Sequence, residues 1–129
     1  MIGITEYRPQ SMLRLPETKP TRARFPVIDA HNHLRHYKGS VPELVARMDE
    51  WNIARILNLD GGYGKPFDEE FARFVVPYPD RFSLLCQVDM SRIDDPDFGR
   101  SMRAYILECA KRGAVGIKFF KSMLGLRVK

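Results

Sequence analysis

Four short apolar runs alternate with three amphipathic segments along this chain, and this alternation limits the possible folds more than any other feature of the sequence. The apolar runs lie at residues 26–30, 54–59, 82–88 and 114–120. Runs of this length bounded by polar residues are typical of buried strands. Because strands joined by helical crossovers pair in parallel, we expect an α/β fold with the order β-α-β-α-β-α-β.

The segments between these runs carry the end signals and the spacing of helices. Ser40 and Asp97 stand before the first and third segments as N-caps, Pro77 ends the second, and Gly113 follows the third as a C-terminal stop. At helical spacing, the apolar stripes are Val41, Leu44, Val45, Met48 and Trp51; Phe67, Phe71, Phe74 and Val75; and Phe98, Met102, Tyr105, Ile106 and Cys109. We therefore expect three helices, each packed on the sheet by one face.

The first 25 residues differ from the rest of the chain. They contain Pro9, Pro16 and Pro20 and show no clean periodicity. We expect an irregular N-terminal arm over residues 1–25 and a folded body over residues 26–129. Most of the net charge of +5 falls in this arm rather than in a basic stripe on the body, so we expect no nucleic-acid partner.

Composition narrows the class of protein further. The chain has 129 residues, about one domain, and no apolar run approaches the ~20 residues that a membrane span needs. Cys86 and Cys109 stand apart within apolar segments and form no C-x-x-C pair, which favours reduced core thiols. We expect a cytoplasmic protein without a membrane partner.

The first apolar run leads into the sequence Asp29-Ala30-His31-Asn32-His33, the sharpest chemical signal in the chain. Residues two apart in a strand face the same side, with Cα atoms about 6.6 Å apart. Two imidazoles at this separation can share one ion at the Zn–N distance of roughly 2.0–2.1 Å. Asp29 lies one step earlier on that face and could orient an imidazole by accepting its second N–H. The alternative is that the histidines are solvated polar residues that end a strand.

This motif, V-I-D-A-H-N-H-L, resembles the D-x-H-x-H signature of the amidohydrolase superfamily. Other stretches resemble one branch of it, the amidohydrolase-related proteins: Y-R-P-Q-S-M-L at 7–13, N-L-D-G-G at 58–62, P-Y-P-D-R-F at 77–82, V-D-M-S-R-I-D-D-P-D-F at 88–98 and G-A-V-G-I-K-F-F-K-S at 113–122. The resemblance covers nearly the whole chain, including the arm. The H-x-H motif is shared across the superfamily and does not identify a substrate.

The resemblance implies a TIM-type (β/α)8 barrel with a metal at the carboxyl ends of its strands, held in part by His31 and His33. Zinc is the first expectation, with manganese or iron as alternatives. The family's further ligands come from strands five, six and eight, which this sequence lacks. Because a whole barrel needs ~250 residues, we expect this chain to be the truncated N-terminal half of such a barrel.

Charged residues also stand at the ends of the second and fourth apolar runs. Lys118 and Lys121 stand at the end of the fourth, where some amidohydrolases carry a carboxylated lysine that bridges two metals. For this chain we favour other roles: Lys118 is a candidate substrate contact, with a solvated loop residue as the alternative. Asp60, within Asp60-Gly61-Gly62, is expected in a flexible loop at the pocket rim.

The sequence thus predicts a metal-dependent hydrolase that acts on C–N or C–O bonds of a small molecule, or a related decarboxylase. As a fragment, the chain is expected to bind metal weakly, to turn over little, and to self-associate through its open sheet edges. The alternative is a small, non-catalytic open α/β domain that binds a ligand or partner. A third reading is assembly with a second polypeptide that supplies the missing strands.

Overall fold

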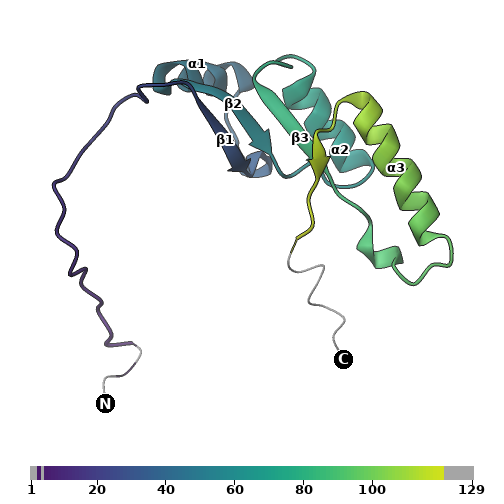
Figure 1. Cartoon of the computed structure of the whole chain (residues 1–129), viewed down its shortest axis with the longest axis horizontal. Coiled ribbons are helices and arrows are strands. Elements are labelled where there is room, and N and C mark those ends of the chain that lie inside the picture. Colours follow the sequence, from purple (N-terminus) through teal and green to yellow (C-terminus); the bar gives the residue numbers. More distant parts are fainter. Residues whose placement is uncertain (1–2, 4, 121–129) are drawn as a thin grey trace.

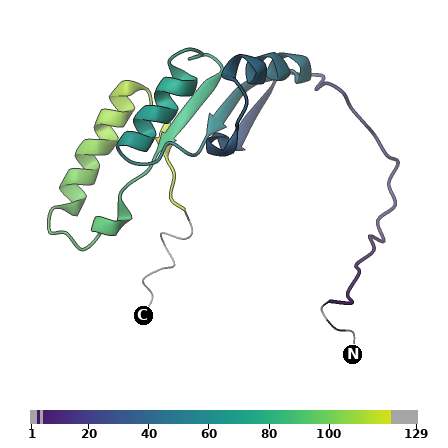
Figure 2. The same ribbon diagram turned by 180° about the vertical axis from the view of Figure 1, so that it is seen from behind.

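Four parallel strands form the sheet of this protein, seen in a computed structural model that describes residues 3 and 5–120 (Figure 1). The strands are β1 (Val27–Asn32), β2 (Ile53–Asn58), β3 (Phe82–Cys86) and β4 (Gly116–Ile117), and they neighbour one another in that order. Every neighbouring pair is parallel, so the predicted parallel α/β sheet is confirmed. The sheet curls into a half-barrel, with the helices on one face (Figures 1 and 2).

Local signals define α1 (Val41–Trp51) and α3 (Phe98–Arg112). Ser40 and Glu43 form a capping box: the backbone N–H of Glu43 donates to Ser40 Oγ at 3.3 Å, and the N–H of Ser40 donates to Glu43 Oε2 at 3.0 Å. Gly113 ends α3 in the left-handed conformation, with φ of 109°. The predicted stop at this glycine is confirmed.

The second predicted helix contains an irregularity. Its first part is the α-helix α2 (Lys65–Glu70), and its second part, Phe71–Val75, is a turn of π-helix. The N–H of Val76 donates to the carbonyl of Phe71 at 3.0 Å, five residues back. The apolar spacing predicted the helix but not this widened turn, which the sequence does not mark.

The core divides into two clusters between helices and sheet. One contains Leu34, Val41, Met48, Ile56, Phe74 and Phe82. The other contains Phe67, Leu84, Cys86 and Cys109, and both cysteines are free thiols. Burial of this apolar surface holds the helices against the strands. It therefore fixes where the carboxyl end of each strand lies in the sheet.

The ends of β1 and β4 differ from the prediction. β1 continues to Asn32, which pairs with Asn58, so His31 lies within the strand and His33 directly after it. β4 has two residues rather than the predicted seven, because its ladder to β3 joins only Leu85 to Gly116 and Cys86 to Ile117. Lys118 therefore lies beyond the strand, and strand alternation does not fix its direction.

Residues 5–25 form no helix or strand, and Figures 1 and 2 show this arm extending away from the sheet. Only its end is tied to the body. Arg22 donates to the carbonyls of Asp49 and Glu50 at the end of α1, and the N–H of Ala23 donates to the carbonyl of Trp51 at 3.2 Å. Within the described ranges, no helix is long and apolar enough to cross a bilayer.

Candidate functional site

Two imidazole rings lie side by side at the carboxyl end of β1. The ring centroids of His31 and His33 are 5.4 Å apart, and the ring planes meet at 64°. His31 comes from the strand itself and His33 from the residue before a short 3-10 turn, Leu34–His36. The rings thus adjoin each other, as ligands of one ion must.

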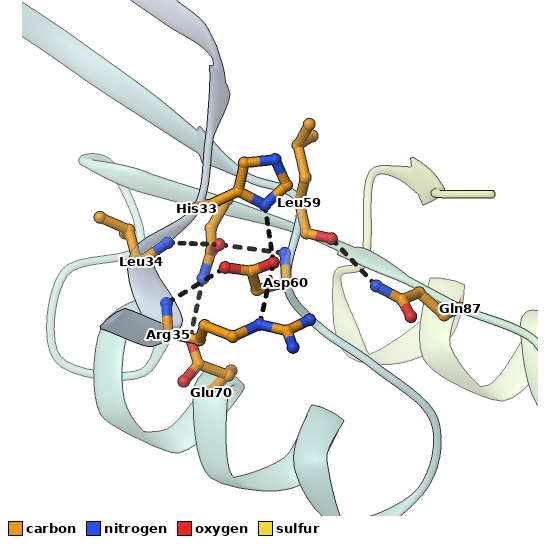
Figure 3. Close-up of polar contacts among 8 residues, drawn as sticks. His33, Leu34, Arg35, Leu59, Asp60, Glu70 and Gln87 are labelled. Carbon is orange, nitrogen blue, oxygen red and sulfur yellow. Dashed lines mark hydrogen bonds and ion pairs between the residues drawn. The ribbon is translucent and has the colours of Figure 1, made fainter. Parts of the chain in front are cut away.

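A buried carboxylate holds one of these rings. Nδ1 of His33 lies 2.7 Å from Oδ1 of Asp60, which follows β2 (Figure 3). The Asp60 side chain is 1% exposed, whereas that of His33 is 39% exposed. Because an ionised carboxylate only accepts hydrogen bonds, Nδ1 carries the proton, and in the neutral ring Nε2 keeps its lone pair. His33 therefore offers Nε2 to any ligand.

Arg35 completes the surroundings of Asp60. Its backbone N–H donates to Oδ2 of Asp60 at 3.2 Å, and its Nε lies 3.3 Å from Oδ1 (Figure 3). Burial by itself raises the pKa of the Asp60 carboxyl, but the hydrogen bonds from His33 and Arg35 and the positive charge of Arg35 together lower that pKa below its ordinary value. Asp60 is consequently a carboxylate at neutral pH.

Asn58 connects the segments around Asp60 through hydrogen bonds of its buried side chain. Its side chain is almost fully buried; its Oδ1 accepts the backbone N–H of Leu34 at 3.2 Å and that of Asp60 at 3.1 Å. Its Nδ2 donates to Oε2 of Glu70 at 2.8 Å. Burial raises the pKa of Glu70 above its ordinary value, although the bond from Asn58 opposes this. Asn58 thus joins the end of β1, the end of β2 and helix α2.

The turn after Asp60 passes close to β3. A Cβ atom on Gly61 would lie 2.0 Å from the carbonyl oxygen of Leu85, and Gly62 has a φ of 68°. Gln87 holds the turn in place: its Nε2 donates to the carbonyl of Leu59 at 3.2 Å (Figure 3). Its backbone N–H donates to the carbonyl of Gly62 at 2.8 Å. The predicted loop is confirmed, because residues 59–64 form no helix or strand, but Asp60 and Gly61 are buried within it rather than exposed at a rim.

Asp29 has other partners than the imidazole that the sequence predicted. Its Oδ1 accepts the backbone N–H of His31 at 3.1 Å, and its Oδ2 accepts Nδ2 of Asn32 at 2.6 Å. The register of β1 against β2 shifts between Asp29 and Asn32, which interrupts the simple alternation of faces. The carboxylate that meets an imidazole is that of Asp60, in the turn after the neighbouring strand β2.

Two further groups, Arg35 and Lys118, lie with His33 around the ring of Phe120. The centroid of the His33 ring lies 5.8 Å from that of Phe120, Arg35 Cζ lies 6.0 Å from the same centroid, and Lys118 Nζ lies 5.5 Å from it. The chain after β4 therefore brings Lys118 to the rim that carries the histidines. Lys121, also considered from the sequence, lies outside the described residues.

The described donor groups supply part of what a metal ion needs. His31 and His33 supply two imidazoles, whereas a catalytic zinc takes three protein ligands and a water. Across residues 3 and 5–120, no three His, Cys, Asp or Glu side chains group so as to hold an ion. The pair fits part of such a shell, and Asp60 fits the role of a carboxylate that orients a ligand.

Sequence reasoning missed Arg35, Asn58 and Glu70 and saw Asp60 only as a rim contact. No local pattern joins Asp60 to His33, which lies 27 positions away. The available signal was topological, since β1 and β2 are neighbouring parallel strands whose carboxyl ends meet. Comparison with protein families, with curated proteins and with solved structures finds no match for this chain.

Proposed function

We propose that this chain carries the metal-binding histidines of a metal-dependent hydrolase of the amidohydrolase-related type. Its reaction would be hydrolysis of a C–N or C–O bond in a small molecule, or a related decarboxylation. The observation that carries the proposal is the contact of His33 Nδ1 with buried Asp60, beside the ring of His31. The TIM-type barrel is part of the same proposal, and the curled parallel sheet is compatible with a portion of one.

The roles of the residues follow from this geometry. Asp60 accepts a hydrogen bond from the Nδ1–H of His33, which fixes the tautomer and leaves Nε2 free for a ligand. His31 offers a second imidazole from the adjoining position. A bound divalent cation, with zinc expected first and manganese or iron as alternatives, would lower the pKa of its water and polarise the scissile bond.

Zinc titration followed by NMR tests the proposal. We expect the imidazole resonances of His31 and His33 to move with added Zn²⁺, and weak binding, since two ligands form an incomplete shell. His33→Ala should abolish the response. Asp60→Asn should weaken binding roughly 10–100-fold, as loss of a ligand's orienting partner does.

His36 provides the matched control, because it is an exposed histidine three positions from His33. We expect His36→Ala to leave the titration unchanged. Equal responses from all three histidines, or no response at millimolar zinc, would contradict the metal role. In that case a melting temperature indifferent to both zinc and chelator would favour the alternative, a small non-catalytic binding domain.

A further inference from the structure

A pocket lies towards the end of the sheet opposite to the histidines, where the strands begin. Its volume is about 340 Å³, which falls in the usual range for small-molecule sites. Arg55 of β2, Ser83 of β3 and Val115, directly before β4, line it from the sheet. Val75 of the π turn and Gly113 after α3 line it from the helices. The pocket is therefore separate from the histidine site.

The charged groups that line this pocket are both positive. They are Arg55 and Arg112, and no acidic side chain of the described residues joins them in the lining. Arg112 is matched by Asp68, with 2.6 Å between Nη1 and Oδ1, and its charge also offsets the carbonyl groups at the end of α3. Arg55 forms no ion pair with any carboxylate across residues 3 and 5–120. The surplus positive charge is thus that of Arg55.

Ser83 places a second donor beside this guanidinium. Ser83 is 7% exposed, and its Oγ accepts a hydrogen bond from Nη1 of Arg55 at 2.8 Å. Because Oγ accepts from Arg55, the hydroxyl proton is free to point elsewhere. In the part of the chain that the structure describes, no group accepts that proton. A half-buried guanidinium without a counter-ion, next to an unused hydroxyl donor, favours an anion from outside the chain.

The other walls of the pocket are apolar. They consist of Phe71, Val75, Val76, Pro79, Phe82 and Val115. Val76 and Val115 are 64% and 60% exposed although both are aliphatic. An inorganic anion would leave these side chains in water, whereas an apolar chain attached to the anionic group would cover them. The lining therefore fits an amphiphilic anion.

We propose that this pocket binds a carboxylate with an apolar chain, such as a medium-chain fatty acid, as a ligand distinct from the substrate. Its carboxylate accepts from the Arg55 guanidinium and the Ser83 hydroxyl, and its chain covers the exposed valines. One carboxylate charge matches the one unmatched guanidinium, whereas a phosphate monoester carries roughly −1.5 to −2 at pH 7. The inference does not rest on the proposed function, because the imidazoles lie at the other end of the strands.

NMR titration of the 129-residue chain with hexanoate tests this inference. Hexanamide, a neutral molecule of the same shape, and acetate, which has the charge without the chain, are the parallel arms. We expect hexanoate to move the resonances of Arg55, Val75 and Val115 to saturation. Hexanamide and acetate should each bind at least about tenfold more weakly, because each lacks one half of the interaction.

Two sets of variants separate the charge from the fold. Arg55→Met should weaken hexanoate binding about tenfold or more, and Arg55→Lys should keep part of it, because a lysine retains the charge without the fork. Lys111→Met is the control, since it removes a positive charge from the last turn of α3 outside the pocket. At the exposed position of Val115, Val115→Glu should bind hexanoate about tenfold more weakly than Val115→Gln, since the two side chains differ only in charge.

Several results would overturn the inference. They are hexanamide or acetate binding as tightly as hexanoate, equal effects of Arg55→Met and Lys111→Met, and no hexanoate binding at tens of millimolar. Equal binding by Val115→Glu and Val115→Gln would do the same without any change to Arg55. Hexanoate that moves Met102 and Ile106 instead of the valines would place the ligand in the apolar groove beside α3, which has no unmatched Arg55.

Discussion

Asp60 holds His33 across two neighbouring strands, with 2.7 Å between Oδ1 and Nδ1 and with only the imidazole reaching the surface. This contact ties the residue directly after β1 to the second residue after β2. Asn58 accepts backbone N–H groups from both segments, so the pair belongs to a buried network rather than to a mobile surface.

Asp60→Asn should destabilise the protein at pH 7 by about 2 kcal/mol, because the buried charged hydrogen bonds are lost. The folded-state pKa of Asp60 is lowered, so its stabilisation is present above the unfolded value of about 3.9 and is lost as pH falls through the folded pKa. Urea unfolding at a series of pH values measures this. The gap between wild type and variant should narrow at low pH, and a constant gap would contradict the assignment. Asp80→Asn, at an exposed position, is the control.

Glu70→Gln should leave the free energy of unfolding at pH 7 unchanged or raise it by a few tenths of a kcal/mol, since a Gln carbonyl still accepts from Asn58 and no charge is buried. The folded-state pKa of Glu70 is raised, so wild type gains stability as pH falls through that pKa. The advantage of the variant should therefore shrink towards pH 4. Glu69→Gln, beside it and exposed, should show no such trend; a clear loss of stability in Glu70→Gln at pH 7 would refute the prediction.

Gly61→Ala should destabilise the protein by about 2 kcal/mol or more, because the added methyl group would overlap the backbone oxygen of Leu85. Gly99→Ala is the matched control. Gly99 lies in α3 with nothing within 4 Å of the added Cβ, so this change should stabilise by up to about 1 kcal/mol. Chemical denaturation measures both. Similar effects of the two substitutions would show that the turn after Asp60 yields to accommodate a side chain.

Self-association should depend on the outer strand β1, where Ile28 is 66% exposed. An exposed edge strand with apolar side chains is a template for pairing with another chain. Light scattering coupled to size exclusion should show species above monomer mass that decrease in Ile28→Lys. Val76→Lys, at a residue 64% exposed after the π turn, should have no effect. A wild-type chain that is monomeric at every concentration would rule out this role of the edge.

Much of the fold was predictable because its signals are local. Ser40 and Glu43 cap α1 within one turn, Gly113 ends α3, and the spacing of apolar residues marked α1, α2 and α3. The parallel sheet followed from the lengths of the connections. The π turn at Phe71–Val75 and the shortness of β4 were not predictable, because each depends on how neighbouring elements pack rather than on nearby sequence.

The sequence by itself determined the chemical groups at the rim, namely the two histidines two positions apart and a lysine near the end of the fourth apolar run. Only the tertiary structure decided that Asp60, and not Asp29, meets an imidazole. That choice depends on the shifted register between Asp29 and Asn32 and on buried Asn58, which fixes the backbone of both strand ends. Contacts of this kind join residues far apart in the chain, and the packing of the whole sheet sets their positions, whereas a cap or a strand period is fixed by a few adjacent residues.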